Sequence, residues 1–225
     1  MNRFHAVLFL SAILSSQAAD KPLPVREEPY HKVIVENDYL RVIDVQIPPG
    51  KTTLYHTHEV ASVIVYLTKS TNSSQTWGDT TGVLTPRSTS PGDSRYANYD
   101  EKALSHRVTN TGATLFRVLD IELLRPLPAS VGFPANPPGG QTTWQEKRVR
   151  SSNIQVASGS WLGVGANECA HFLVITAGAM TANVGSQKGP SRDLAAQEFL
   201  FIPPNTAFRV AAASQKAEAV LLELK

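Results

Sequence analysis

The sequence predicts an all-β protein made of two jelly-roll barrels, that is, two double-stranded β-helices that form separate lobes. Short runs rich in β-branched residues recur between turn residues along most of the chain, whereas helical periodicity is nearly absent. A segment rich in proline and glycine divides these runs into two groups. Many short strands in two groups favour barrels or sandwiches over a parallel sheet with crossover helices.

The expected strands are short and are separated by turn residues, as is typical of all-β proteins. In the first half of the chain they cover residues 32–36, 40–47, 60–67 and 115–124. In the second half they cover residues 171–176, 180–184, 198–202, 207–210 and 217–224.

Residues 1–19 have the pattern of a secretory signal peptide. Arg3 precedes an apolar run over residues 4–14, and small residues follow as far as Ala19. We expect cleavage near Ala18 or Ala19 and a secreted or periplasmic mature protein. The apolar run is too short to span a bilayer, which needs about 20 apolar residues. No later segment comes close to that length, so no membrane span is expected.

Charge and cysteine content exclude some classes of protein. The 225 residues include 21 Lys and Arg and 19 Asp and Glu, scattered along the chain for a net charge of +2. Because no basic stripe is present, nucleic acid is not an expected partner. Cys169 is the only cysteine, so no intramolecular disulfide can form. A chain of this length can bury a core without disulfides.

The expected lobes cover residues 30–125 and 147–225, with a linker over residues 126–146 between them. Prolines and glycines crowd this linker. Proline removes a backbone donor and glycine weakens a strand, so the linker should be extended rather than paired.

A weak internal repeat supports two lobes of the same kind. Gly50 stands six residues before His56, and Gly165 stands six residues before His171. His106 and Phe208 form a second pair of similar positions, later in each half, and they are closer together in the chain than His56 and His171. This difference predicts a longer loop region in the first half. Residues 68–105 are polar and rich in turn residues, and we expect them to cover one mouth of the barrel.

Three histidines have the spacing of metal ligands. His56 and His58 are two residues apart in an extended segment, so both rings should face the same side. With His106, later in the same lobe, they offer three imidazole nitrogens, which bind transition metals at about 2.0–2.1 Å. The alternative is structural, with His56 and His58 on a solvated strand edge and His106 satisfied in the core by a backbone carbonyl.

The same residues resemble the cupin superfamily. Its first motif is a glycine, five residues, His-x-His and a later glutamate, and Gly50, His56 and His58 match it in register. Its second motif ends in His-x3-Asn, which His106 and Asn110 match.

The resemblance covers residues 30–125 well and residues 147–225 weakly. It implies two jelly-roll barrels, with a divalent metal held by the three histidines of the first lobe. We expect Asn110 and Ser62 to lie around the ion or on its bound water.

The chain departs from the cupin pattern at the fourth ligand and throughout the second lobe. The family's glutamate should fall at or next to Ser62. Glu59 is close, but its parity in the strand is opposite to that of the histidines, so it should face away. In the second lobe Leu173 and Phe208 stand where ligands are expected, and His171 alone cannot hold a metal. The second lobe should therefore be degenerate.

Three neutral imidazoles without a carboxylate favour iron, nickel, copper or zinc over manganese, which prefers oxygen ligands. The resemblance implies either a small-molecule metalloenzyme, of dioxygenase, decarboxylase or isomerase type, or a non-catalytic module that binds a small ligand or another protein. A positioned general base would separate the two, and the sequence contains no unambiguous one. We expect an exported metal-binding protein, with its catalytic role and self-association left open.

Overall fold

The computed structural model describes residues 21–82, 84, 86–126, 131–136, 139–185, 191–213 and 215–225. The expected signal peptide over residues 1–19 lies outside these ranges. Within them the chain is β-structure and loops, with one short 3-10 turn, η1 (Val25–Glu27). No helix among the described residues has the length and hydropathy needed to cross a membrane.

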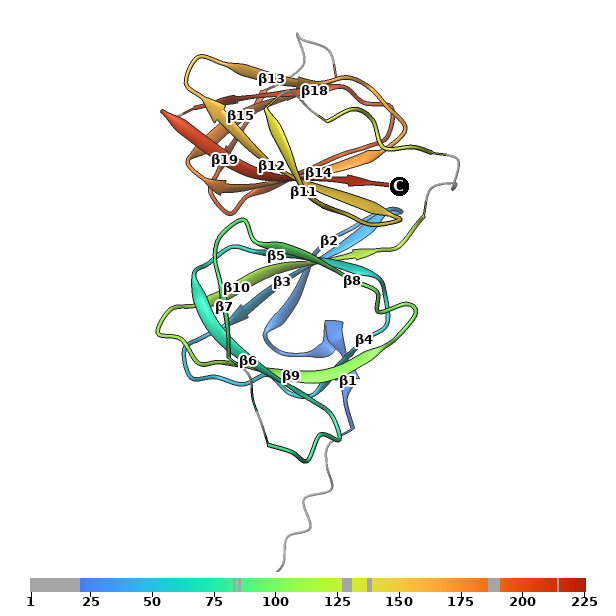
Figure 1. Ribbon diagram of the computed structural model, residues 1–225, viewed down its shortest axis with the longest axis vertical. Helices are drawn as coiled ribbons and strands as arrows, with labels where there is room; N and C mark the ends of the chain where they lie inside the picture. Colours follow the sequence, from blue (N-terminus) through green and yellow to red (C-terminus); the bar gives the residue numbers. More distant parts are fainter. Residues whose placement is uncertain are drawn as a thin grey trace, which may run out of the picture.

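The first lobe is a barrel of two five-stranded sheets, seen in the lower half of Figure 1. One sheet has the strand order β1-β4-β9-β6-β7, and the other has the order β2-β3-β10-β5-β8. The strands are β1 (Leu23–Pro24), β2 (His31–Glu36), β3 (Leu40–Ile47), β4 (His56–His58), β5 (Ser62–Tyr66), β6 (Ser70–Thr76), β7 (Pro86–Thr89), β8 (Ser94–Ala97), β9 (Leu104–Asn110) and β10 (Phe116–Leu123).

The second lobe, in the upper half of Figure 1, is a similar barrel. Its sheets have the orders β11-β12-β19-β14-β17 and β13-β18-β15-β16. The strands are β11 (Gly140–Gln145), β12 (Val149–Ala157), β13 (Trp161–Val164), β14 (Ala170–Ala177), β15 (Ala179–Val184), β16 (Ser191–Ala195), β17 (Phe199–Ile202), β18 (Phe208–Ala212) and β19 (Lys216–Leu224).

The two lobes repeat one topology. The order β2-β3-β10-β5-β8 of the first lobe corresponds to β11-β12-β19-β14-β17 of the second, and β4-β9-β6-β7 corresponds to β13-β18-β15-β16. The nine strands expected from the sequence all form, with small differences at their ends. The prediction of an all-β protein with two jelly-roll lobes is therefore confirmed.

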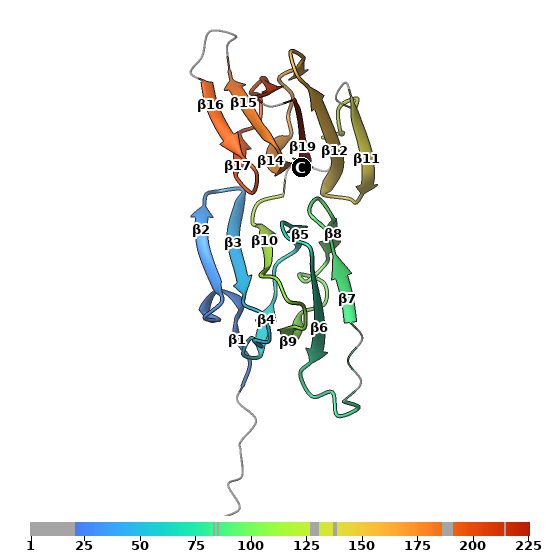
Figure 2. The ribbon, with the colours of Figure 1, turned by 90° about the vertical axis from the view of Figure 1, so that its left-hand side faces the viewer.

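The lobes are joined by a shared hydrophobic cluster between the sheets β2-β3-β10-β5-β8 and β11-β12-β19-β14-β17, which lie against each other in Figures 1 and 2. Leu40 and Val42 of β3 belong to this cluster, together with Phe172 of β14. Ile43 and Val45, on the opposite face of β3, pack inside the first lobe. Because both faces of such strands are buried, their sequences are nearly continuous apolar runs.

Both lobes begin earlier than the sequence indicates. Leu23 and Pro24 form a short parallel strand beside β4, ahead of the expected start at residue 30. Residues 140–145, expected in the linker, form β11 and pair with β12. The two-residue strand β1 is too short to carry a pattern. In β11, Thr142, Thr143 and Trp144 are good strand formers that follow directly on the prolines and glycines.

The polar stretch over residues 68–105 is different from the expected loop region, because it supplies the strands β6, β7 and β8. These strands could not be recognised in the sequence because their residues are mostly polar. Asn72 and Ser74 of β6 line a cavity inside the barrel rather than an apolar core, so the usual alternation of apolar and polar residues is missing.

The two histidines of the Gly-x5-His repeat lie on strands that are not equivalent in the two lobes. His56 lies on β4, whose counterpart is β13, whereas His171 lies on β14, the counterpart of β5. In β5 Ser62 pairs with Glu122, and in β14 His171 pairs with Glu223. His171 therefore corresponds to Ser62, and the shared spacing to a glycine is a coincidence of loop length.

Candidate metal centre

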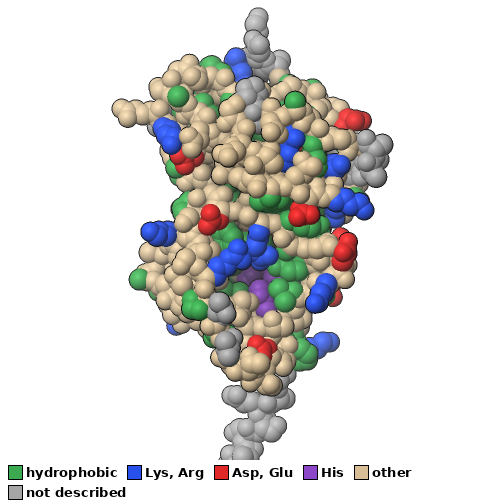
Figure 3. Space-filling model, in the orientation of Figure 1, with side chains coloured by type: hydrophobic (Ala, Val, Ile, Leu, Met, Phe, Trp, Pro, Cys, Tyr) green, Lys and Arg blue, Asp and Glu red, His purple; other side chains and the backbone are tan. Residues whose placement is uncertain are grey.

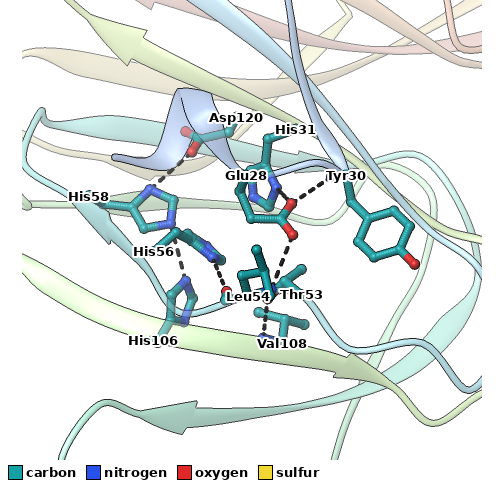
Figure 4. A network of polar contacts seen from close by, with 10 residues as sticks. All are labelled: Glu28, Tyr30, His31, Thr53, Leu54, His56, His58, His106, Val108 and Asp120. Carbon is teal, nitrogen blue, oxygen red and sulfur yellow. Dashed lines mark hydrogen bonds and ion pairs between the residues drawn. The ribbon is translucent and has the colours of Figure 1, made fainter. Parts of the chain in front are cut away.

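The three expected histidines come together inside the first lobe (Figure 4). His56 and His58 are the two ends of β4, and Thr57 between them points away to Ser105. His106 of β9 lies directly opposite His56 in the antiparallel pair. All three rings are buried, and one nitrogen from each lies within 4.8 Å of the other two. Strand alternation and pairing register together produce this convergence.

Two of the rings meet at their Nε2 atoms. His58 Nε2 lies 3.1 Å from His106 Nε2. Two imidazole nitrogens bound to one ion at about 2.0–2.1 Å would be roughly 3 Å apart, so this distance suits a shared metal. His56 Nε2 is buried without a hydrogen-bond partner among the described residues. An unpartnered buried nitrogen is costly, and an ion at this point would satisfy it.

The outer nitrogen of each ring has a polar neighbour. His56 Nδ1 donates to the carbonyl oxygen of Leu54 at 2.9 Å, which leaves Nε2 deprotonated. His106 Nδ1 lies 2.9 Å from Ser74 Oγ. Ligating histidines normally have such partners, which fix the tautomer and the direction of the ring.

Asp120 lies beside the outer nitrogen of His58 and was missed by sequence reasoning. Its Oδ2 lies 3.2 Å from His58 Nδ1, and the carboxyl is almost fully buried on β10. Burial alone raises the pKa of Asp120, but contacts with His58 and Ser62 outweigh it and hold that pKa below its ordinary value. The site therefore contains a buried carboxylate behind one histidine. Only strand pairing brings Asp120 here, since it lies in an apolar run far from His58 in the chain.

Burial keeps His56 and His106 neutral. The pKa of His56 is lowered to about 3, first by burial and then by electrostatic interaction with His31 and His58. The pKa of His106 is lowered to about 2 by burial, by His56 and His58, and by the nearby guanidinium of Arg95. Neutral imidazole is the form that binds metals, so these two rings are ready as ligands at physiological pH.

A second carboxylate and histidine pair adjoins the cluster. His31 Nδ1 lies 2.5 Å from Glu28 Oε2, and both side chains are buried. Glu28 also accepts hydrogen bonds from the backbone of Tyr30 and Leu54 (Figure 4). The His31 ring is 4.5 Å from the ring of His56 and lines the cavity. A histidine oriented by a buried carboxylate is a common proton-transfer group.

The sequence gives little indication that Glu28 and His31 belong to the site. Glu28 and His31 lie just before the strand expected over residues 32–36, with nothing in their spacing to connect them with His56. Local sequence cannot show that β2 and β4 bring these residues into one barrel.

Three other expected residues have mixed outcomes. Glu59 is exposed and outside the cluster, as its parity predicts. Ser62 is buried and contacts Asp120, so it lies behind the histidines. Asn110 is buried but belongs to a turn: its amide donates to the carbonyls of Ile47 and Thr114, 2.8 Å away in each case. The expectation that Asn110 lies around the ion is therefore wrong, because these backbone bonds use its side chain.

Within the described residues, His171 is neither hydrogen-bonded nor exposed. It is fully buried, and neither ring nitrogen has a hydrogen-bond partner among the described residues. Its ring lies 5.3 Å from that of Phe208, in the interior of the second lobe. Burial, with the charge of Arg150, lowers the pKa of His171 to about 4. Among the described residues it belongs to no group of three or more potential metal ligands.

The histidine cluster opens into a cavity of about 640 Å³. Figure 3 shows histidine side chains at the bottom of a hollow in the first lobe, with Lys and Arg side chains beside it. A cavity of this size suits a small molecule. Besides the histidines and Asp120, its polar lining includes Tyr66, Asn72, Ser74, Arg87, Arg95 and Tyr99.

Comparison with known proteins finds similarity at the level of structure. No protein-family model and no curated protein sequence matches the chain. AerE from Microcystis aeruginosa superposes with a TM-score of 0.62 at 14% identity, over 88% of this chain and 98% of that one. A cupin 2 conserved barrel domain protein from Leptotrichia buccalis gives 0.54 at 12% identity, over 87% and 88% of the two chains.

A structure of Bacillus subtilis oxalate decarboxylase, described for its Mn(II) centres, gives a TM-score of 0.55 at 14% identity, over 83% of this chain and 68% of that one. At such identities the matches show a common fold and nothing finer. The matches extend over 83–88% of this chain and so include both lobes. The chain therefore has the two-barrel fold of the cupin superfamily.

Proposed function

We propose that the first lobe binds one divalent transition metal through His56, His58 and His106 and holds a small molecule beside it. The observation that carries this proposal is the arrangement of ring nitrogens. The Nδ1 atoms of His56 and His106 lie within hydrogen-bond distance of Leu54 and Ser74, and that of His58 lies 3.2 Å from a carboxylate oxygen of Asp120. The Nε2 atoms of His58 and His106 meet, and that of His56 is buried without a hydrogen-bond partner among the described residues. Three neutral imidazoles converging in a buried pocket form a typical metal-binding set.

The choice of metal is wider than the sequence suggests. Manganese was disfavoured because the sequence showed no carboxylate near the histidines. In the structure, however, Asp120 lies next to His58. The Mn(II) centres of oxalate decarboxylase, which shares this fold, favour manganese over the iron, nickel, copper or zinc expected from the sequence. A bound divalent ion would supply Lewis-acid or redox chemistry at open positions facing the cavity.

A catalytic role is supported by the pair of His31 and Glu28. The sequence offered no positioned proton-transfer group, whereas His31 lies in the cavity wall next to His56, with Glu28 hydrogen-bonded to it. We therefore propose a small-molecule metalloenzyme rather than a module that only binds. A survey of small organic substrates with the metal-loaded protein tests this, and binding without turnover across the survey would favour the non-catalytic function.

Metal content is the decisive measurement for the site. Elemental analysis of purified protein, prepared without chelators and after reconstitution, should give about one ion per chain. His58→Ala leaves two ligands and should lose stoichiometric metal. The matched control His171→Ala removes a buried histidine from the second lobe and should keep it. Equal loss in both variants, or a wild type that never holds metal, would contradict the proposal.

We also propose that the protein is exported, on the strength of the amino-terminal pattern over residues 1–19. Intact-mass measurement of protein recovered from the medium or cell envelope should show an amino terminus near Ala19 or Asp20. Recovery there of a chain that still begins at Met1 would contradict cleavage.

A further inference from the structure

Two arginines of the first lobe point to the class of molecule that enters the cavity. Arg87 lies on β7 and Arg95 on β8, which are the edge strands of the two sheets of the barrel. Both side chains line the cavity that also contains His56, His58 and His106. The two guanidinium groups therefore place positive charge in the cavity at the edges of the two sheets.

Neither arginine is neutralised by the protein. Among the described residues, Arg41, Arg117 and Arg150 each form an ion pair with a buried carboxylate, whereas Arg87 and Arg95 form none. Arg95 donates instead to two neutral hydroxyls, from Nε to Tyr66 at 3.3 Å and from Nη2 to Tyr99 at 3.2 Å. A partly buried guanidinium with only neutral partners leaves an uncompensated charge, which an anion would neutralise.

The surrounding groups are donors as well. The hydroxyl oxygens of Tyr66 and Tyr99 accept from Arg95, so each keeps its own hydrogen for another acceptor. The guanidinium of Arg87 lies 5.7 Å above the ring of Tyr66. We call Arg87, Arg95, Tyr66 and Tyr99 the anion clasp. Two planar guanidinium forks and two hydroxyls match the acceptor oxygens of a carboxylate.

The anion clasp adjoins the proposed metal ligands. The ring of Tyr99 lies 4.7 Å from the ring of His58, so one side chain separates the guanidinium of Arg95 from the histidine cluster. A molecule of a few carbon atoms in the cavity can therefore face the clasp at one end and the histidines at the other.

We infer that the cavity binds a small organic acid, whose carboxylate is held by the anion clasp and whose second oxygen group faces His56, His58 and His106. This inference rests on the proposed function, since it names the substrate class of the same site. It selects acids over sugars, amides and apolar molecules, because the clasp offers positive charge and donors, and its tyrosine hydroxyls already accept hydrogen bonds from Arg95.

The test compares acids with their neutral analogues on the full-length mature protein, with metal content measured in parallel. Malonate and succinate are titrated by calorimetry against malonamide and succinamide. The acids should bind, and the amides should bind at least about 10-fold more weakly. Arg95→Gln should weaken acid binding by about 10- to 100-fold, leave amide binding unchanged and keep the metal.

Two further variants keep the result interpretable. Arg87→Gln changes an exposed side chain, so this variant should fold even if Arg95→Gln does not. It should also weaken acid binding. Arg192→Gln makes the same substitution on an exposed strand of the second lobe and should change nothing. Metal-loaded protein that binds amides as well as acids, or acid affinity that survives both clasp variants, would overturn the inference and leave the metal site standing. Absence of metal would instead overturn the proposed function.

Discussion

The two lobes have the same strand order but opposite interiors. In the first lobe His56 pairs with His106 between β4 and β9, and at the corresponding place in the second lobe Val164 pairs with Phe208. Asp120 likewise has Leu221 as its counterpart, because each lies two residues before the glutamate paired with β5 or β14. The first barrel encloses a cavity in which polar side chains lie beside an apolar cluster, whereas the second is filled by an apolar cluster.

One polar feature survives in both lobes. Arg41 faces Glu122 between β3 and β10, and Arg150 faces Glu223 between β12 and β19. Both pairs occupy the same place in the sheet that borders the shared cluster. The two lobes thus share their sheets and this arginine–glutamate pair, while one interior forms a candidate site and the other a core.

The largest expected effect comes from breaking the arginine pair of the second lobe. Glu223→Ala leaves Arg150 buried without a carboxylate and should cost about 3–5 kcal/mol in the free energy of unfolding, measured with urea. Glu122→Ala should cost less, because Arg41 keeps its bonds to Glu36. Equal losses in the two variants would show that burial in the second lobe adds nothing to the importance of the pair.

A smaller effect is expected from the carboxylate that distinguishes the polar interior. Asp120→Asn removes the charge behind His58 and should lower metal affinity about 10- to 100-fold, measured by competition with a chelator. Asp44→Asn is the matched control, since Asp44 is also buried but bonds Arg117 on the opposite face of the sheet. If the control lowers metal affinity as much, general destabilisation explains the loss.

The smallest effect concerns the remaining histidine of the apolar interior. His171→Leu removes two unpartnered buried nitrogens and should stabilise the protein by about 1 kcal/mol at neutral pH, with metal content unchanged. A thermal melt gives the shift in Tm.

The gain from His171→Leu should also depend on pH. The pKa of His171 in the folded protein, about 4, lies below its ordinary value of 6.5, so the unfolded chain binds the proton more readily between these values. Wild-type stability should therefore fall as pH drops through this window. Arg150, whose charge acts on the ring, is bonded to Glu223, which lies opposite His171 in the strand pair. The advantage of the variant should grow from pH 7 to pH 5, and a constant difference would show that His171 takes up its proton without penalty.

A good part of the fold could be predicted from the sequence, because it depends on local pattern. The strand at residues 40–47 forms at those positions, since alternate residues of Leu40–Ile47 serve two apolar environments. The pair His56 and His58 was assignable to one face because strand alternation is local. Polar strands such as β6 and the two-residue β1 could not be predicted, since they lie in a cavity wall or at a sheet edge.

The class of fold, the two lobes and three of the buried side chains of the candidate site could be predicted from the sequence alone. The residues around them could be identified only in the folded protein. Asp120, the pair of Glu28 and His31, and the anion clasp come from segments distant in the chain, and strand pairing brings these segments together. Register depends on the packing of whole sheets, so no short motif encodes it. For the same reason the repeat of Gly-x5-His suggested a false match for His171, which the strand order corrects.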